Sequence, residues 1–303
     1  MSIQGKIIKR FIGILMSGWL KSKGIEDSRS AMEKLASHSI TPSNISTIPL
    51  NIQGLKGEWI IPKVSHEDRV ILYLHGGGYV QGSIRTHRDL IARICRAANA
   101  RSLGINYRLA PENPFPTALE DTIKTYLWLL DEDIHPKNII LAGDSAGGGL
   151  AISAMVSLRD SGHPLPAGAV CLSPWTDLVS TGETIRTKVS SDPILTPDEC
   201  RKYANLYSRD HDLKHPLISP LYAELNDLPP ILIQVGTEEI LLDDSVRIAK
   251  RLQDFEVEVT LEIWEEMVHV FQSFAVILPE GRKAIINIGN FIEKCLNTEE
   301  SIK

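Results

Sequence analysis

The segment Gly143-Asp-Ser-Ala-Gly147 places a serine between two glycines, directly after a run of strand-forming residues. Residues 138–141 predict a short buried strand and the residues from 147 onward predict a helix, so Ser145 falls at a strand-to-helix turn. Such a sharp turn strains its apex and brings neighbouring backbone close, which explains the two flanking glycines. The spacing therefore predicts a nucleophile elbow, although ordinary tight strand-helix junctions share it.

A serine hydroxyl is a weak nucleophile until a base takes its proton, and the base works best when an acid fixes its tautomer. After a nucleophile elbow, the expected chain order is serine, acid, histidine. Of the nine histidines, we assign His269 as the base because it follows the last expected strand. The other histidines that we weighed favour solvated or capping roles: His38, His66, His135, His163, His211 and His215.

The acid is expected in the loop after the strand predicted over residues 231–235. Four acidic residues lie there, Glu238, Glu239, Asp243 and Asp244. We favour Glu239, with Glu238 as the alternative. The two aspartates also suit the first turn of the helix that follows, where a carboxylate stabilises the helix N-terminus.

A glycine loop, His75-Gly-Gly-Gly78, follows another predicted buried strand. The backbone of a glycine loop after a buried strand is not covered by side chains, so its N–H groups can donate to the oxyanion of an acyl-transfer reaction. We expect Gly77 and Gly78 to donate from this loop and Ala146 to donate from the elbow, while His75 positions the loop. Tyr79 and Asp144, the neighbours of these two segments, are expected to line the substrate pocket.

The predicted elements around these motifs alternate between apolar strands and amphipathic helices. Residues 48–52 and 57–61 predict an antiparallel strand pair at a sheet edge. Later strands are predicted at 70–74, 102–107, 139–142, 167–172, 231–235 and 257–264, and helices at 85–99, 118–130, 150–159, 244–255 and through 285–291. This alternation predicts a parallel sheet with helices on both faces.

The expected division of the chain has three parts. Residues 1–45 are predicted to form N-terminal cap helices, and residues 46–176 and 226–303 the core. The stretch 177–225, with a helical pattern from 197 to 207, is too long for an ordinary loop and is interpreted as a cap insertion. The apolar run 11–20 is broken by glycines and lacks a cleavage site, so it favours an amphipathic helix over a signal peptide.

Composition excludes several classes of function. The net charge of -6 gives no basic footprint for nucleic acid. The four cysteines are far apart, so neither a disulfide framework nor a structural metal is indicated. No stretch is long enough to span a bilayer, and a cytoplasmic location is expected.

Further motifs accompany the glycine loop and the elbow: Tyr107-Arg-Leu-Ala-Pro-Glu with Phe115-Pro, Ser173-Pro-Trp, Asp192-Pro and Ser219-Pro-Leu. Together they resemble the bacterial hormone-sensitive-lipase-like branch of the α/β-hydrolases, over essentially everything after residue 45. The resemblance implies an eight-stranded, mainly parallel sheet, a helical cap and cofactor-free hydrolysis of carboxylic esters.

Position by position, the resemblance assigns Ser145 as nucleophile, His269 as base, and Gly77, Gly78 and Ala146 as the oxyanion hole. Many members have Asp-Pro-Leu where this chain has Glu239-Ile-Leu. The aligned acid is thus a glutamate, and the doubled Glu238-Glu239 leaves two candidates. Dimerisation is common in the family, so a homodimer is a further expectation.

The sequence therefore predicts a serine carboxylesterase that needs no metal or cofactor. The resemblance favours small-molecule esters with short to medium acyl chains. Amide or carbamate hydrolysis by the same residues is one alternative, because the motifs describe acyl transfer and not the leaving group. A catalytically inactive small-molecule receptor of the same fold is another, which the presence of His269 disfavours.

Overall fold

The computed structural model describes residues 24–37 and 41–297. The expected N-terminal helices lie partly outside the described residues, including the apolar run 11–20. Within the described part, α2 (Ile25–Ala36) is the first helix.

In the described part of the chain, eight strands form one sheet, in the order β1-β2-β4-β3-β5-β6-β7-β8. Their bounds are β1 (Ile45–Ile52), β2 (Leu55–Pro62), β3 (His66–Leu74), β4 (Ala100–Ile105), β5 (Ile139–Asp144), β6 (Gly168–Leu172), β7 (Ile231–Gly236) and β8 (Val259–Trp264). β2 pairs antiparallel with both β1 and β4, and all other neighbours are parallel. The predicted eight-stranded, mostly parallel sheet with an antiparallel edge pair is confirmed.

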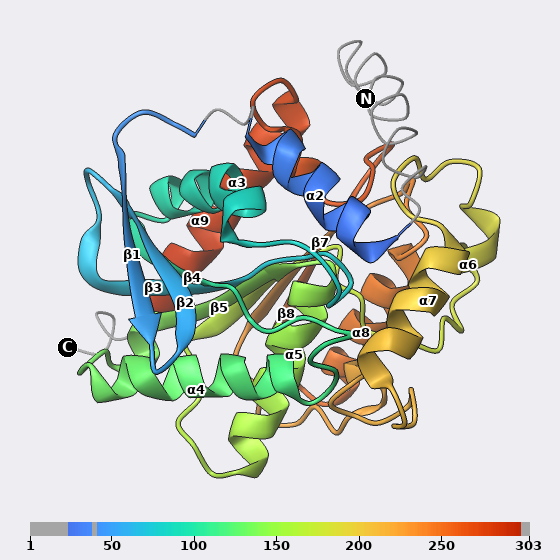
Figure 1. Cartoon of the computed structure of the whole chain (residues 1–303). Coiled ribbons are helices and arrows are strands. Elements are labelled where there is room, and N and C mark those ends of the chain that lie inside the picture. Colours follow the sequence, from blue (N-terminus) through green and yellow to red (C-terminus); the bar gives the residue numbers. More distant parts are fainter. Residues whose placement is uncertain (1–23, 38–40, 298–303) are drawn as a thin grey trace.

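The longer helices cover both faces of this sheet (Figure 1). One face carries α3 (Ile84–Ala97) and α9 (Pro279–Leu296), and the other carries α4 (Thr117–Asp131), α5 (Ala146–Asp160) and α8 (Leu242–Asp254). Side chains alternate between the two: Leu72 packs in the core on the α4, α5 and α8 side, whereas Ile71 and Tyr73 pack on the α3 and α9 side. Because both faces of the sheet are buried, the parallel strands have continuous apolar sequences.

The strand and the helix that flank Ser145 both come closer to it than predicted. β5 extends to Asp144, beyond the predicted strand, and α5 begins at Ala146, just before the residues from 147 onward that predict a helix. The whole change of direction is therefore made at Ser145, because the small residues that follow pack into the first turns of α5 without steric conflict.

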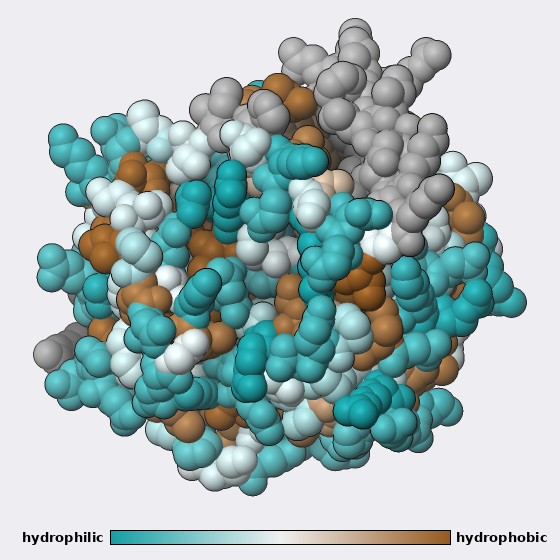
Figure 2. Space-filling view, viewed as in Figure 1, coloured by the Kyte–Doolittle hydropathy of each residue, from teal (hydrophilic) through white to brown (hydrophobic). Residues whose placement is uncertain are grey.

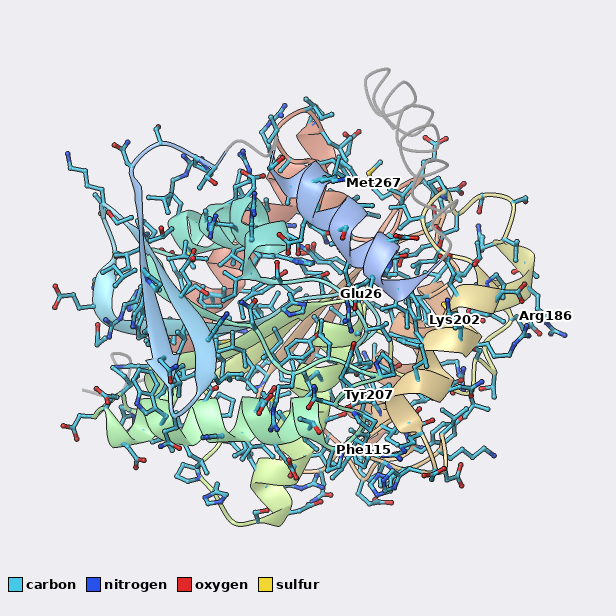
Figure 3. All side chains as sticks on the ribbon, in the orientation of Figure 1. Glu26, Phe115, Arg186, Lys202, Tyr207 and Met267 are labelled. Carbon is cyan, nitrogen blue, oxygen red and sulfur yellow. The ribbon has the colours of Figure 1, made fainter. Side chains whose placement is uncertain are left out.

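The stretch between β6 and β7, expected as an insertion over residues 177–225, contains α6 (Thr184–Thr187) and α7 (Pro197–Ser208). In Figure 1, α2 lies close to α7 beside one end of the sheet. Tyr207 of α7 packs edge-on against Phe115, with ring centroids 5.9 Å apart (Figure 3). The face over α2, α4 and α7 is largely hydrophilic, with hydrophobic residues singly or in small groups (Figure 2).

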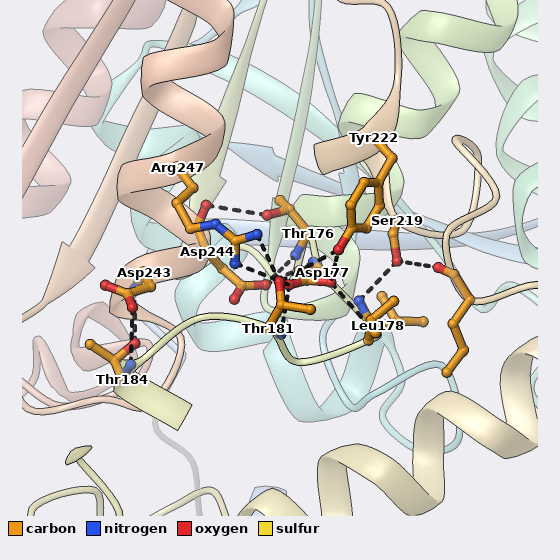
Figure 4. A network of polar contacts seen from close by, with 12 residues as sticks. Thr176, Asp177, Leu178, Thr181, Thr184, Ser219, Tyr222, Asp243, Asp244 and Arg247 are labelled. Atoms are coloured by element: carbon orange, nitrogen blue, oxygen red, sulfur yellow. Dashed lines mark hydrogen bonds and ion pairs between the residues drawn. The ribbon is translucent and has the colours of Figure 1, made fainter. Parts of the chain in front are cut away.

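A buried polar network fastens the start of this stretch to α8 (Figure 4). Asp244 Oδ2 accepts hydrogen bonds from the backbone N–H groups of Thr176 and Asp177, each at 2.8 Å. The Asp177 carboxylate is fully buried and accepts from Arg247 at 3.0 Å and from the Tyr222 hydroxyl, also at 3.0 Å. Burial, reinforced by the charge of Asp177, raises the pKa of Asp244 to about 7.

This raised pKa predicts a pH-dependent stability that Asp244→Asn should remove. Between about pH 4 and 7 the folded chain retains a proton on Asp244 that the unfolded chain releases, so the free energy of unfolding falls as pH rises through this window. An asparagine oxygen can still accept both backbone N–H groups without carrying charge. We expect the variant to be more stable than wild type at pH 8.5, by on the order of a few kcal/mol. Urea unfolding at pH 5.5 and 8.5 measures this, and an equal loss of stability with pH in both proteins would contradict it.

Candidate active site

Ser145 occupies a strained turn between β5 and α5. Its backbone has φ 54° and ψ -120°, and its N–H donates to the Leu172 carbonyl at 2.8 Å. A Cβ atom on Gly143 would collide with the Gly147 backbone, and one on Gly147 would collide with the Leu74 carbonyl. The two glycines are therefore required by close backbone approach, as the sequence predicts.

His269 lies in the segment after β8, and its imidazole is buried against Glu239. Nδ1 of His269 is 2.7 Å from Oε2 of Glu239, whose side chain is fully buried. A carboxylate can only accept, so Nδ1 carries the hydrogen and Nε2 is left as the proton acceptor. This is the orientation that a general base for a serine requires.

The other Glu239 oxygen is also held. Oε1 accepts from the Ser173 hydroxyl at 2.8 Å and from the Gly236 N–H at 2.7 Å. Ser173 in turn accepts from the N–H of Val270, the residue after His269, at 3.1 Å. The Ser173-Pro-Trp motif does not by itself predict this role for Ser173, since nothing local in the sequence reveals a partner 66 residues away.

Glu238 takes a different direction from its neighbour. Its backbone N–H donates to the Met267 carbonyl, and its carboxylate lies 3.9 Å from the Lys188 ammonium. The side chain is 20% exposed, compared with 0% for Glu239. Of the two adjacent glutamates, the structure thus brings Glu239 to His269.

The glycine loop follows β3 and is shaped by two residues with positive φ, Gly77 at 116° and Gly78 at 62°. The Gly77 carbonyl accepts from the N–H groups of Val80 and Gln81, which closes the loop. Both glycines line the same pocket as Ser145, and Ala146 begins α5, where N–H groups lack intrahelical partners. Gly77 and Gly78 thus face the same pocket as Ser145, and Ala146 directly follows the serine in the chain.

The Asp144 carboxylate holds the glycine loop in place through a hydrogen bond. Its Oδ1 accepts from the Gly76 N–H at 3.1 Å and from the Tyr73 hydroxyl at 2.8 Å, and its Oδ2 lies 3.3 Å from Nε2 of His87. Burial opposes the charge on both partners, but their attraction prevails, so the pKa of Asp144 is lowered and the pKa of His87 is raised. Protonated His87 thus offsets the negative charge of Asp144, which lies next to the site where an oxyanion would develop.

His87 is a residue that the sequence reasoning missed. It lies in the first turn of α3, five residues after Gly82, and its position beneath the glycine loop depends on how α3 packs on the sheet. His75 lies nearby, stacked on Tyr107 with ring centroids 4.2 Å apart. Burial and the neighbouring charge of His87 lower the pKa of His75 to about 3, so His75 is neutral and suits the positioning role expected for it.

A pocket of about 640 Å³ opens above Ser145. The core contributes Gly77, Gly78, Asp144, Ser145, Trp175 and His269. Helix α2 contributes Met32 and Leu35, and the stretch between β6 and β7 contributes Ile194, Leu195 and Tyr203. Most of these side chains are apolar, so the pocket suits a substrate with a hydrocarbon portion.

Tyr79 does not lie in this lining, contrary to expectation. Its ring is 1% exposed and stacks on Tyr207 at 3.7 Å between centroids. Tyr79 has a positive φ of 63°, which turns the side chain away from the glycine loop and into the core beneath α7. It therefore supports the wall of the pocket from behind.

Helix α2 is held over the glycine loop by polar contacts. Arg29 donates to the carbonyls of Val80 and Ala110, both at 2.8 Å, and pairs with Glu112 at 2.9 Å. One helical turn on, Glu33 accepts from the Ser83 hydroxyl at 2.5 Å. The segment that follows the glycine loop thus anchors one wall of the pocket.

Gly77→Ala should damage the oxyanion donors while leaving the fold intact. A Cβ there would strike the Gln81 carbonyl, which forces the loop to move. Because removing one oxyanion donor costs about a hundred- to a thousandfold in kcat, we expect a loss of at least about a hundredfold. Gly162→Ala is the matched control, since Gly162 also has positive φ but faces open space. Steady-state kinetics on an aryl ester compares them, and equal activities in the two variants would contradict the assignment.

The pH dependence of hydrolysis should report on His269. Burial lowers its pKa, but hydrogen bonding and charge attraction from Glu239 outweigh this, with further contributions from Asp192 and Asp144, so the pKa of His269 is raised. Only neutral imidazole can accept the serine proton, so kcat/KM should fall as pH decreases through a value above about 6.5. A profile of kcat/KM against pH checks this, and an acid limb well below 6.5 would contradict it.

Known proteins resemble this chain over most of its length. A family model described as the alpha/beta hydrolase fold matches residues 71–273. An acetyl-hydrolase of Streptomyces hygroscopicus is 41% identical over 273 residues, which cover 90% of this chain and 89% of the relative. The crystal structure of an esterase from the bacterial hormone-sensitive lipase family superposes with a TM-score of 0.93 at 44% identity, covering 98% of this chain and 99% of that one.

A third relative is EstE5, in a crystal soaked with p-nitrophenyl butyrate. It has a TM-score of 0.92 at 39% identity and covers 98% of this chain and 99% of its own. The sheet order and the strained serine between β5 and α5 are typical of the α/β-hydrolases. The comparisons indicate the same class of protein. The chain belongs to the bacterial hormone-sensitive-lipase-like branch of the α/β-hydrolase family.

None of the helices within residues 24–37 and 41–297 is long and apolar enough to cross a membrane. Cys95, Cys171 and Cys200 are buried free thiols.

Proposed function

We propose that this protein is a serine carboxylesterase in which Ser145 is the nucleophile, His269 the base and Glu239 the acid. One observation carries the proposal: the hydroxyl-bearing elbow, the Glu239-bound imidazole and the glycine loop face a single apolar pocket. The esterase and acetyl-hydrolase names of the relatives agree with it.

The reaction follows from this arrangement. Nε2 of His269 takes the proton of Ser145 as Oγ attacks the ester carbonyl, and the carbonyl oxygen becomes an oxyanion bound by the N–H groups of Gly77, Gly78 and Ala146. The imidazolium, stabilised by Glu239, returns the proton to the leaving alcohol oxygen. Water, activated by the same nitrogen, then attacks the acyl-enzyme, and the acid leaves as Ser145 regains its proton.

The substrate is a small-molecule ester with a short to medium acyl chain. The pocket volume of about 640 Å³ lies within the range of small-molecule sites and is lined mainly by apolar side chains. The relative named acetyl-hydrolase supports the shorter end of this range.

A series of p-nitrophenyl esters from acetate to palmitate tests the proposal. We expect kcat/KM to be highest for short to medium chains and to fall steeply for palmitate. A matched anilide should react far more slowly, because its nitrogen is a poorer leaving group. Faster anilide turnover would favour an amidase, and failure of Ser145 to react with an organophosphonate would favour a receptor.

We also propose that α2 and the 177–225 stretch together form a cap over the core, since both supply pocket walls. Residues 46–176 and 226–303 then make up the catalytic core. A homodimer and a cytoplasmic location remain predictions from the family resemblance and the sequence. Light scattering after size exclusion tests the first, and fractionation of the source cells tests the second.

A further inference from the structure

Asp192 is a buried carboxylate that the proposed mechanism does not use. It lies between α6 and α7, in the Asp192-Pro pair noted from the sequence, and is 8% exposed. No Lys or Arg of the described residues forms a salt bridge with it, so its charge is satisfied by other donors.

Within the described residues, three backbone N–H groups donate to its side chain. Oδ1 accepts from Ile194 at 2.8 Å and from Leu195 at 3.0 Å, and Oδ2 accepts from Ile240 at 2.9 Å. Donors thus converge on both oxygens. An asparagine at this place would turn its NH₂ group toward at least one of these amides, so the site requires a carboxylate.

The two oxygens of Asp192 hold different parts of the active site. Ile194 and Leu195 line the substrate pocket. Ile240 directly follows Glu239, and its own carbonyl accepts from the Thr184 hydroxyl at 2.8 Å. One side chain therefore joins a wall that touches the substrate to the loop that carries the acid.

The charge of Asp192 also acts on His269. Burial raises the pKa of Asp192, while the charge of His269 and the backbone N–H donors act in the opposite direction. The Asp192 carboxylate in turn favours the protonated imidazole of His269. The charged groups that face His269 are Glu239, Asp192 and Asp144, whereas Glu199 and Cys200 of α7 are the other titratable groups near Asp192.

We propose that Asp192 is a positioning residue of this esterase: it ties the pocket wall at Ile194 and Leu195 to the Glu239 loop and supplies a second negative charge to His269. As His269 takes the serine proton, the charges of Glu239 and Asp192, two carboxylates that are both fixed by hydrogen bonds, favour the imidazolium. The hydrogen bonds of Asp192 hold Glu239 at a fixed position relative to the pocket wall at Ile194 and Leu195. This wall contacts the acyl or alcohol part of the substrate.

The test is Asp192→Asn, with Asp121→Asn as the matched control. Asp121 is 3% exposed and accepts from the Arg108 backbone N–H at 2.9 Å, but it lies on α4 outside the pocket. We expect Asp192→Asn to lower the plateau kcat about tenfold and to move the acid limb of kcat/KM to lower pH by about half a pH unit or more. Asp121→Asn should leave the limb in place, because it removes a carboxylate that is paired with Arg108 at 2.7 Å and does not act on His269.

Two further measurements keep the outcome clear. Asp192→Glu retains the charge, so its acid limb should stay at the wild-type position while KM for longer esters rises. An NMR titration of the His269 imidazole, assigned with a His269→Gln variant, reads the same pKa without turnover. An unchanged His269 titration in folded Asp192→Asn would overturn the proposal.

This inference rests on the proposed esterase function. The experiments distinguish a failure of that function from a failure of the role proposed for Asp192. If wild type hydrolyses no ester, the function fails while the NMR titration still reports on Asp192. If wild type is active but the Asp192→Asn limb coincides with wild type, only the role of Asp192 fails.

Discussion

Replacing Ser145 with alanine should lower kcat for p-nitrophenyl butyrate by about a millionfold, the largest effect that we expect from any single substitution. The reason is that the acyl-enzyme route disappears, while the oxyanion donors and the pocket remain. Removing the hydroxyl leaves the strained turn in place, because its geometry depends on Gly143, Gly147 and the hydrogen bond to Leu172. Steady-state kinetics together with far-UV circular dichroism measures the loss and verifies the fold.

Ser153→Ala is the matched control for this experiment. Ser153 lies on the same helix, α5, and is 1% exposed, but it does not line the pocket. It should retain near wild-type turnover and form a covalent adduct with an organophosphonate probe, detected by mass spectrometry. Ser145→Ala should form no adduct. Undiminished turnover in Ser145→Ala would refute the proposed nucleophile.

Glu239→Gln should produce the second-largest effect, a loss of about ten-thousandfold in kcat. A glutamine cannot act as a charged acceptor for Nδ1–H, so it no longer fixes the tautomer that leaves Nε2 as the base, and it does not stabilise the imidazolium. Kinetics at a pH well above the acid limb separates this loss from a simple shift in titration.

Glu238→Gln provides the matched control, since the two residues are adjacent and chemically identical. Glu238 lies 3.9 Å from Lys188, and a long, partly exposed ion pair contributes little. We expect less than about a threefold change in kcat. Comparable losses in the two variants would mean that the acid of the triad cannot be assigned to Glu239 alone.

Local steric rules made the nucleophile predictable. The glycines at 143 and 147 are required because backbone atoms of Gly147 and Leu74 approach the positions where their Cβ atoms would stand. Any chain that makes this turn needs the same small residues at the same spacing, so the sequence predicts the tight turn at Ser145, and the other motifs make this serine the candidate nucleophile. The same holds for the apolar strands and for the antiparallel edge pair, whose patterns reflect burial on two faces or on one.

Long-range contacts decided what the sequence left open. Glu238 and Glu239 are identical in type, and only the course of the loop after β7 turns Glu239 toward His269. Tyr79 was expected in the pocket because it follows the glycine loop, but its positive φ directs the ring against Tyr207. Adjacency in sequence says little about direction where the backbone leaves the common conformations.

The remaining features belong to the tertiary structure alone. His87 pairs with Asp144 because α3 packs against the sheet beneath the glycine loop, and Asp192 reaches Ile240 across 48 residues. Neither contact has a local signature, since each partner is an ordinary polar residue in its own segment. The sequence by itself thus determined the tight turn at the proposed nucleophile, the chain order of its proposed partners and the layers that hold them, because sterics and burial act locally. Which carboxylates and imidazoles meet was decided only when the chain folded, because charge and hydrogen bonding depend on distances that packing sets.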